Sequence, residues 1–168
     1  MRVCGIDPGI AIVGYGFVDV RGNQLSAVDY GSIQTEAGLA VPTRLKQVYD
    51  GTKYLLQKYR PDVVAIEKLF FNRNVTTAFT VGQARGVMML ACEEEGIEIT
   101  EYTPLQVKMS AVGYGKATKR QVQEMVKLLL NLTQIPKPDD VADALAIAIC
   151  EAHSGEALRK LKGRGVKK

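Results

Sequence analysis

Four acidic residues stand at the ends or beginnings of segments that can form regular structure. Asp7 ends a short apolar run, and Glu67 directly follows the mostly apolar segment 62–66. Asp140 and Asp143 are three residues apart near the start of a predicted helix, so their side chains lie on the same side of it. If the strand ends meet this helix in the fold, the four carboxylates converge.

Such a convergence predicts a site for divalent metal ions. Neighbouring carboxylates repel one another, and partial burial disfavours their anionic forms, so a counter-charge is needed. Mg²⁺ and Mn²⁺ prefer carboxylate oxygens and water. Two such ions about 3.5–4 Å apart clamp the attacking and leaving oxygens of a phosphodiester during in-line displacement. We therefore expect phosphodiester hydrolysis with two ions per active site, Mg²⁺ as the metal and Mn²⁺ as its substitute, and as ligands Asp7, Glu67, Asp140 and Asp143.

Each acid also has an ordinary structural explanation. The alternatives are a turn at Asp7-Pro8-Gly9, pairing of Glu67 with Lys68 or Arg73, and the preference of acids such as Asp140 and Asp143 for a helix N-terminus. To account for all four acids, these explanations would have to be correct independently at three separate segments of the chain. A nucleophilic mechanism is a poor alternative, because there is no Gly-x-Ser-x-Gly motif and the single histidine, His153, has no placed partner.

The elements that must position these acids follow from periodicity and turn residues. Predicted strands cover 2–6, 11–20, 24–33, 62–66 and 97–102, and predicted helices cover 43–59, 74–95, 104–111, 118–131 and 139–153. Thr43 is the expected N-cap of the first helix. This order predicts an α/β protein with a mixed five-stranded sheet flanked by helices, and it is the element order of the ribonuclease H-like fold.

Length and composition predict one globular domain. The chain has 168 residues, of which 46% are hydrophobic and 24% charged, so we expect a domain over 1–154 followed by a basic, flexible segment over 155–168. The three cysteines are far apart and are expected to be buried thiols in a reducing compartment. No apolar run approaches the roughly 18 residues of a membrane span. We therefore expect a cytoplasmic protein without a membrane partner.

Charge is distributed unevenly along the chain. The net charge is +4, and residues 156–168 alone hold six basic residues and one acidic residue. Basic residues also prevail within 68–86 and 104–127, whereas five glutamates cluster within 93–101. A solvated terminus explains the basic end of the chain as well as a polyanion-binding arm does. The pattern as a whole weakly favours a polyanionic partner over an acidic small molecule.

The same segments, taken together, resemble the RuvC family of Holliday-junction resolvases over about residues 1–152. The resemblance depends on an ordered set of motifs. They are Gly5-Ile6-Asp7-Pro8-Gly9, Gly14-Tyr15-Gly16, Ala65-Ile66-Glu67 with Phe70, Gly82-Gln83-Ala84-Arg85-Gly86, Gln106-Val107-Lys108 and Asp140-Val141-Ala142-Asp143-Ala144-Leu145-Ala146.

This resemblance implies a homodimeric, metal-dependent endonuclease of homologous recombination and DNA repair. Such an enzyme places symmetrical nicks at a four-way DNA junction and leaves 5′-phosphate and 3′-hydroxyl ends. It also implies a branch-migration motor and junction-binding proteins as partners. The four acids fall on the family's catalytic positions. The third of these is His in some members, so Asp140 favours a site made only of oxygen ligands.

The resemblance further implies DNA contacts and a dimer interface. Lys108 and Lys119 fall on basic positions implicated in DNA contact and catalysis, and Phe70 falls on an aromatic position implicated in stacking on an opened base. The full set of candidate DNA contacts is Phe70, Arg73, Lys108, Lys116, Lys119 and Arg120. The candidate dimer interface lies on the helix 74–95, at Gly82, Arg85, Gly86 and Met89, although ordinary packing of this helix on the sheet explains its apolar surface too.

Three other functions compete with junction resolution. A nuclease of the same fold could act on ribosomal RNA precursors or RNA–DNA hybrids, and a non-enzymatic protein could bind junctions without cutting them. An ATPase of the actin-like fold would share the Asp7-Pro8-Gly9 hairpin. It needs a duplicated domain, which 168 residues cannot supply.

Overall fold

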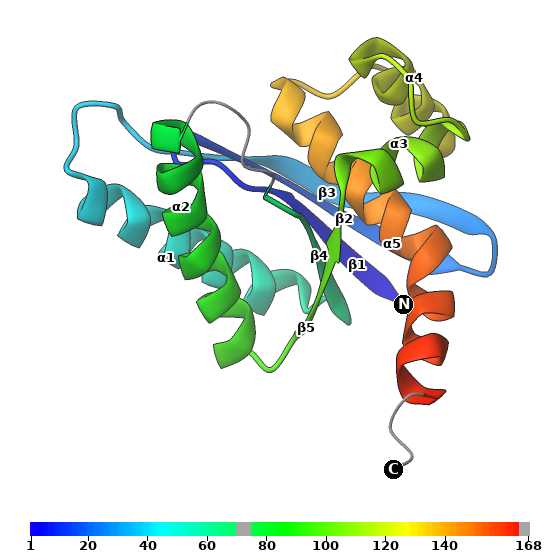
Figure 1. Cartoon of the computed structure of the whole chain (residues 1–168), viewed down its shortest axis with the longest axis horizontal. Coiled ribbons are helices and arrows are strands. Elements are labelled where there is room, and N and C mark those ends of the chain that lie inside the picture. Colours follow the sequence, from blue (N-terminus) through cyan, green and yellow to red (C-terminus); the bar gives the residue numbers. More distant parts are fainter. Residues whose placement is uncertain (70–74, 165–168) are drawn as a thin grey trace.

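In the part of the chain that the structure describes, the central element is a five-stranded sheet (Figure 1). The computed structural model describes residues 1–69 and 75–164, and it describes side chains for 1–69 and 78–155. Within this part, the strands are β1 (Arg2–Asp7), β2 (Ile12–Arg21), β3 (Gln24–Gln34), β4 (Val63–Glu67) and β5 (Glu98–Tyr102).

These strands lie in the order β3-β2-β1-β4-β5. β1 pairs antiparallel with β2, and β2 with β3, because short turns connect them. β4 pairs parallel with both β1 and β5, after helical crossovers. The prediction of a mixed five-stranded sheet is confirmed.

Helices cover both faces of the sheet. They are α1 (Val41–Tyr59), α2 (Val75–Glu94), α3 (Pro104–Val112), α4 (Lys119–Leu129) and α5 (Asp139–Arg164). One hydrophobic core lies between the sheet and α1 and α2, and a second lies between the sheet and α3, α4 and α5. Figure 1 shows α5 crossing the sheet on the face opposite α1 and α2.

Two predicted helix boundaries are wrong. α1 begins at Val41 with Ala40 as its N-cap, and Thr43 is not the cap. Pro42 explains the earlier start, because its fixed φ suits the first turn of a helix. α5 continues past His153 to Arg164, so residues 155–164 of the predicted flexible segment are helical. The division into a domain and a basic arm stays a prediction.

Strand alternation places two of the acids on the α5 face of the sheet. Successive side chains of a strand point to opposite faces. On β1, Val3 packs in the core under α5 and Cys4 packs in the core under α1 and α2, while on β4 Ala65 packs under α5. Asp7 and Glu67 follow Val3 and Ala65 by an even number of residues. Both acids therefore end their strands on the side of the sheet that α5 covers.

Glycines in β1 and β2 let the α5 backbone lie directly on the strands. A Cβ at Gly14 would stand 1.9 Å from the carbonyl oxygen of Asp140, and a Cβ at Gly5 would stand 2.0 Å from that of Ala144. A Cβ at Gly16 would meet the side chain of Leu145 at 2.4 Å. No side chain fits at Gly5 or Gly14 unless α5 moves away from the sheet, whereas a Cβ at Gly16 would require the side chain of Leu145 to shift.

Two further findings concern the cysteines and the hydrophobic character of the helices. All three cysteines are buried and free, as expected. Among the described residues, no helix has the length and apolar character needed to cross a membrane.

We predict that Gly14→Ala destabilises the protein by about 1–3 kcal/mol, because the new methyl group meets helix backbone that cannot yield without moving α5. The measurement is the free energy of unfolding in denaturant. Gly38→Ala is the matched control, since a Cβ there has no atom within 4 Å, and we expect it to change stability by less than about 0.5 kcal/mol. Equal stabilities of the two variants would contradict the tight contact.

Candidate active site

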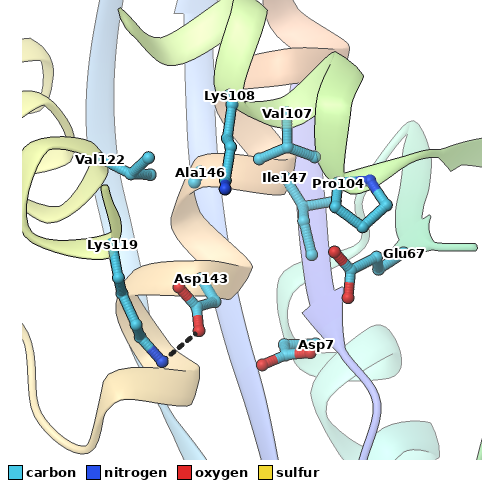
Figure 2. Close-up of a pocket in the computed structure, with 10 residues that line it drawn as sticks. All are labelled: Asp7, Glu67, Pro104, Val107, Lys108, Lys119, Val122, Asp143, Ala146 and Ile147. Atoms are coloured by element: carbon cyan, nitrogen blue, oxygen red, sulfur yellow. Dashed lines mark ion pairs between the residues drawn. The ribbon is translucent and has the colours of Figure 1, made fainter. Parts of the chain in front are cut away.

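Three of the four predicted acids line one pocket. Asp7 comes from the end of β1, Glu67 from the end of β4 and Asp143 from the first turns of α5. The pocket has a volume of about 270 Å³. Figure 2 shows these carboxylates on one side of it, below a wall from α3, α4 and α5. The other lining residues are Pro104, Val107, Lys108, Lys119, Val122, Ala146 and Ile147.

The acids share one electrostatic environment. The pKa of Asp7 is raised to about 8, mainly by burial and then by the charges of Asp143, Glu67 and Asp140 in that order, while Lys119 lowers it. Burial and the charge of Asp143 also raise the pKa of Glu67. Such mutual repulsion in a half-buried pocket is the condition under which a bound cation stabilises the charged forms.

Asp140 differs from the other three acids. It is not among the residues that line the pocket, although its charge acts on Asp7. A spacing of three residues offsets two side chains by about 60° around a helix. This offset allows Asp143 to face the pocket while Asp140 lies at its margin.

Lys119 is the cation nearest to the acids in the described part of the chain. Its Nζ lies 2.9 Å from Asp143 Oδ2 and 3.6 Å from Asp139 Oδ2, and Figure 2 shows the pair with Asp143. Burial raises the pKa of Asp143, and the hydrogen bond from Lys119 opposes this effect. Asp139 also pairs with Lys137 at 3.0 Å. Sequence alone carries no signal that it contacts Lys119.

The two lysines of the pocket are held by helices with well-defined starts. α3 begins with a capping box in which Thr103 and Gln106 exchange hydrogen bonds, and α4 begins with the same arrangement of Thr118 and Gln121. A capping box satisfies backbone donors that a helix start leaves unpaired. Lys119 therefore stands in the first turn of a helix whose start is fixed.

The residues fit a divalent metal ion by their chemistry, because the donors are carboxylates only. Their side-chain positions do not yet form a metal site. Among residues 1–69 and 78–155, no three acidic, histidine or cysteine side chains come together closely enough to hold an ion. The contact of Asp143 with Lys119 is one reason, since it orients a carboxylate toward a lysine.

The other predicted DNA contacts occupy different surroundings. Lys108 lines the pocket. Lys116 is exposed, and Arg120 is exposed with its Nη2 2.5 Å from Glu124 Oε1. Phe70 and Arg73 lie outside the described residues.

The predicted dimer residues are not all on one side of α2. Gly86 is exposed and has open space around its Cα, whereas a Cβ at Gly82 would lie 3.6 Å from Leu69. Arg85 pairs with Glu101 of the neighbouring strand β5 and also donates a hydrogen bond to the sulfur of Met89. The exposed apolar side chains of α2 lie on the side that Gly86 shares, namely Phe79 and Leu90.

A mixed five-stranded sheet with acids at the ends of β1 and β4, facing further acids on α5, defines a ribonuclease H-like nuclease. A family model described as crossover junction endodeoxyribonuclease RuvC matches residues 3–151. The chain belongs to this family. It is therefore a crossover junction endodeoxyribonuclease, and as a nuclease of this family it depends on a divalent metal ion.

Similar proteins agree with this assignment. The crossover junction endodeoxyribonuclease RuvC of Brevibacillus brevis is 66% identical over 152 residues, which cover 90% of this chain and 92% of that protein. The RuvC of Alkaliphilus metalliredigens is 58% identical, covering 96% of this chain and all of that protein. Thermus thermophilus RuvC superimposes with a TM-score of 0.87 at 35% identity, covering 94% of this chain and 96% of that one. The T. thermophilus RuvC structure in complex with a Holliday junction substrate gives a TM-score of 0.86 at 33% identity, with the same coverage.

The raised pKa of Asp7 predicts how the stability of the metal-free protein depends on pH. Between the ordinary pKa of an aspartate and about pH 8, the folded state holds a proton on Asp7 that the unfolded chain has lost. Stability therefore falls as the pH rises through this range and loses nothing further above it. Asp7→Asn removes this effect. We expect its stability advantage over the wild type to grow from about pH 4 to about pH 8 and then to stay constant.

Denaturant unfolding in EDTA at a series of pH values measures this difference. Asp50→Asn, on the exposed surface of α1 and outside the pocket, is the control. Its stability difference from the wild type should not grow toward pH 8, so the two curves should run parallel there. If Asp7→Asn also runs parallel, Asp7 is not in a desolvated, acid-crowded site.

Proposed function

We propose that Asp7, Glu67, Asp140 and Asp143 together hold the divalent ions with which this chain cuts four-way DNA junctions. The observation that carries the proposal is the crowding at Asp7, whose pKa is raised by burial and by each of the other three acids. We further propose Mg²⁺ as the ion, Mn²⁺ as its substitute, and two ions per site. Two bound ions supply activation of the attacking water and stabilisation of the departing 3′ oxygen.

The chain's own side chains position the substrate. Lys119 and Lys108 lie at the pocket, where they attract the scissile phosphate. The ammonium group of Lys119 is a mobile point charge, and it can stabilise negative charge that develops on that phosphate once Asp143 binds metal. Lys116 and Arg120 are exposed near the start of α4 and are proposed to contact the DNA backbone. Phe70 and Arg73, which are not among the described residues, are also proposed to contact the junction.

The substrate is proposed to be a four-way junction cut by paired symmetrical nicks, leaving 5′-phosphate and 3′-hydroxyl ends. The solved complex of T. thermophilus RuvC with a Holliday junction supports this proposal. DNA as substrate supports a cytoplasmic location and a role in homologous recombination and repair. A motor for branch migration and junction-binding proteins are proposed as further partners.

A second copy of the chain is proposed to complete the enzyme. One site makes one nick, whereas resolving a four-way junction needs two matched nicks, and a twofold dimer presents two equivalent sites. The exposed side of α2 supports this proposal, because Phe79 is 67% exposed and Leu90 is 52% exposed on either side of Gly86.

We predict that Asp7→Asn lowers the cleavage rate of a four-way junction by about a thousandfold, because metal ions contribute several kcal/mol to such reactions. Junction binding in EDTA should stay intact, since the substitution removes no positive charge that attracts DNA. The measurement compares a synthetic junction, a linear duplex and an RNA–DNA hybrid, with Mg²⁺ and with EDTA. Asp50→Asn should cut like the wild type. Rapid cutting by Asp7→Asn would remove Asp7 from the site, and cutting of the hybrid as well as the junction would favour a broader nuclease.

We predict that Leu90→Glu converts the dimer to a monomer, because it places a charge within an apolar interface. Sedimentation velocity measures the oligomeric state. Leu128→Glu on α4 is the matched control, since Leu128 is also exposed, at 71%. If the leucine-to-glutamate change acts equally at both positions, α2 is not the specific interface.

A further inference from the structure

A carboxylate is fully buried in α5, away from the pocket. Glu151 has no exposed surface, and its Oε2 accepts two hydrogen bonds from β5. The hydroxyl of Tyr102 donates over 2.6 Å and the hydroxyl of Thr100 donates over 2.7 Å. The other oxygen, Oε1, packs against Gly155, where a Cβ would stand 1.9 Å from it. The surroundings are therefore shaped to take this side chain.

Stability alone does not explain this arrangement. The neighbours of Glu151 along the helix, Ile149 and Cys150, are buried apolar residues. An apolar side chain of similar volume often stabilises a protein as well as a buried charged group does or better, because a buried charge is costly to desolvate. Hydrogen bonds are directional, however, and a satisfied buried network specifies one arrangement of the elements it joins.

The network joins α5, the helix that carries Asp143, to β5, the strand beside β4 and its Glu67. Tyr102 is the register partner of Glu67 across β4 and β5. Its backbone oxygen accepts a hydrogen bond of 2.8 Å from the amide of Lys68, the residue after Glu67. Glu151 follows Asp143 by about two turns on α5. A short chain of contacts thus leads from the strand end at Glu67 to the helix that holds Asp143.

This contact complements the glycine contact at the other end of α5. Gly14 lies under Asp140 and Gly5 lies under Ala144 and Ala148, so β1 and β2 limit how closely the start of the helix approaches. Apolar packing of α5 on the sheet also holds the helix, but such packing is not directional. The hydrogen bonds of Glu151 to β5 attach the helix at a second point, and a pivot of the helix over the sheet would break them.

We propose that Glu151 is a positioning residue for the nuclease reaction, which fixes the angle of α5 over the sheet and so the placement of Asp143 relative to Glu67. The inference rests on the proposed function of these acids. A small misplacement of reacting groups lowers a rate by up to about a hundredfold even when the changed residue is remote. The expected effect is therefore on the chemical step and not on DNA affinity.

The test measures single-turnover cleavage of a junction with Mg²⁺, junction affinity in EDTA and thermal stability for the full chain. For Glu151→Met, which fills the same space without an acceptor, we expect unchanged affinity and a lower melting temperature, because the buried hydroxyls of Tyr102 and Thr100 lose this acceptor. Its cleavage rate should fall about tenfold to a hundredfold. Glu151→Gln keeps an acceptor oxygen and should recover most of the rate. Ile149→Val is the matched control: it is buried on the same helix, and it should lower the melting temperature without slowing cleavage.

The outcomes separate the inference from the proposed function. If Asp7→Asn is inactive while Glu151→Met cuts at the wild-type rate, the positioning role is wrong and the metal site stands. If Asp7→Asn itself cuts normally, the proposed site fails. Should Glu151→Met not fold, Tyr102→Phe decides: slower cleavage with unchanged affinity supports the role, and a wild-type rate overturns it.

Discussion

Several carboxylates lie in one half-buried pocket although they repel one another. The close packing of α5 on the sheet offsets this repulsion and keeps them together. The helix backbone rests on glycines of β1 and β2, which brings the start of α5 to the strand end at Asp7. Alternation along the strands directs Asp7 and Glu67 to the same face. Folding therefore stabilises an arrangement of charges that the isolated residues would avoid.

The positive charge at the pocket follows from the same constraint. Lys119 lies against Asp143 and Asp139 at the start of α4, so the metal-free pocket already contains a counter-charge. A lysine is suited to this place because its long side chain moves easily and its ammonium group has no fixed direction. The site thus combines fixed acids on strands with mobile cations on helices. Such a combination suits a negatively charged substrate, such as DNA, that binds to the site and is later released.

Much of this architecture could be predicted from sequence, because its signals are local. The strands and their order follow from the apolar runs before Asp7 and Glu67 and from the turn residues between elements. Side-chain contacts between distant segments could not be predicted in this way. The pairing of Lys119 with Asp139 and the buried bonds of Glu151 depend on how α4, α5 and β5 meet in space. The start of α1 differs from the predicted one because Pro42 favours the first turn of a helix, although threonine favours the N-cap. The helical residues 155–164 were missed because charge and glycine content say little about whether a helix continues.

The glycines of β1 and β2 that lie under α5 also make the two faces of the sheet differ in how well they tolerate substitutions. On the α5 face, Gly5 and Gly14 admit no side chain unless the helix backbone moves, so a library that varies them would mostly yield misfolded chains. The opposite face is an ordinary core in which side chains of α1 and α2 meet those of the strands, and such cores accept volume-conserving exchanges. Substitutions intended to raise the thermal stability without changing the chemistry should therefore be made in the core on that second face.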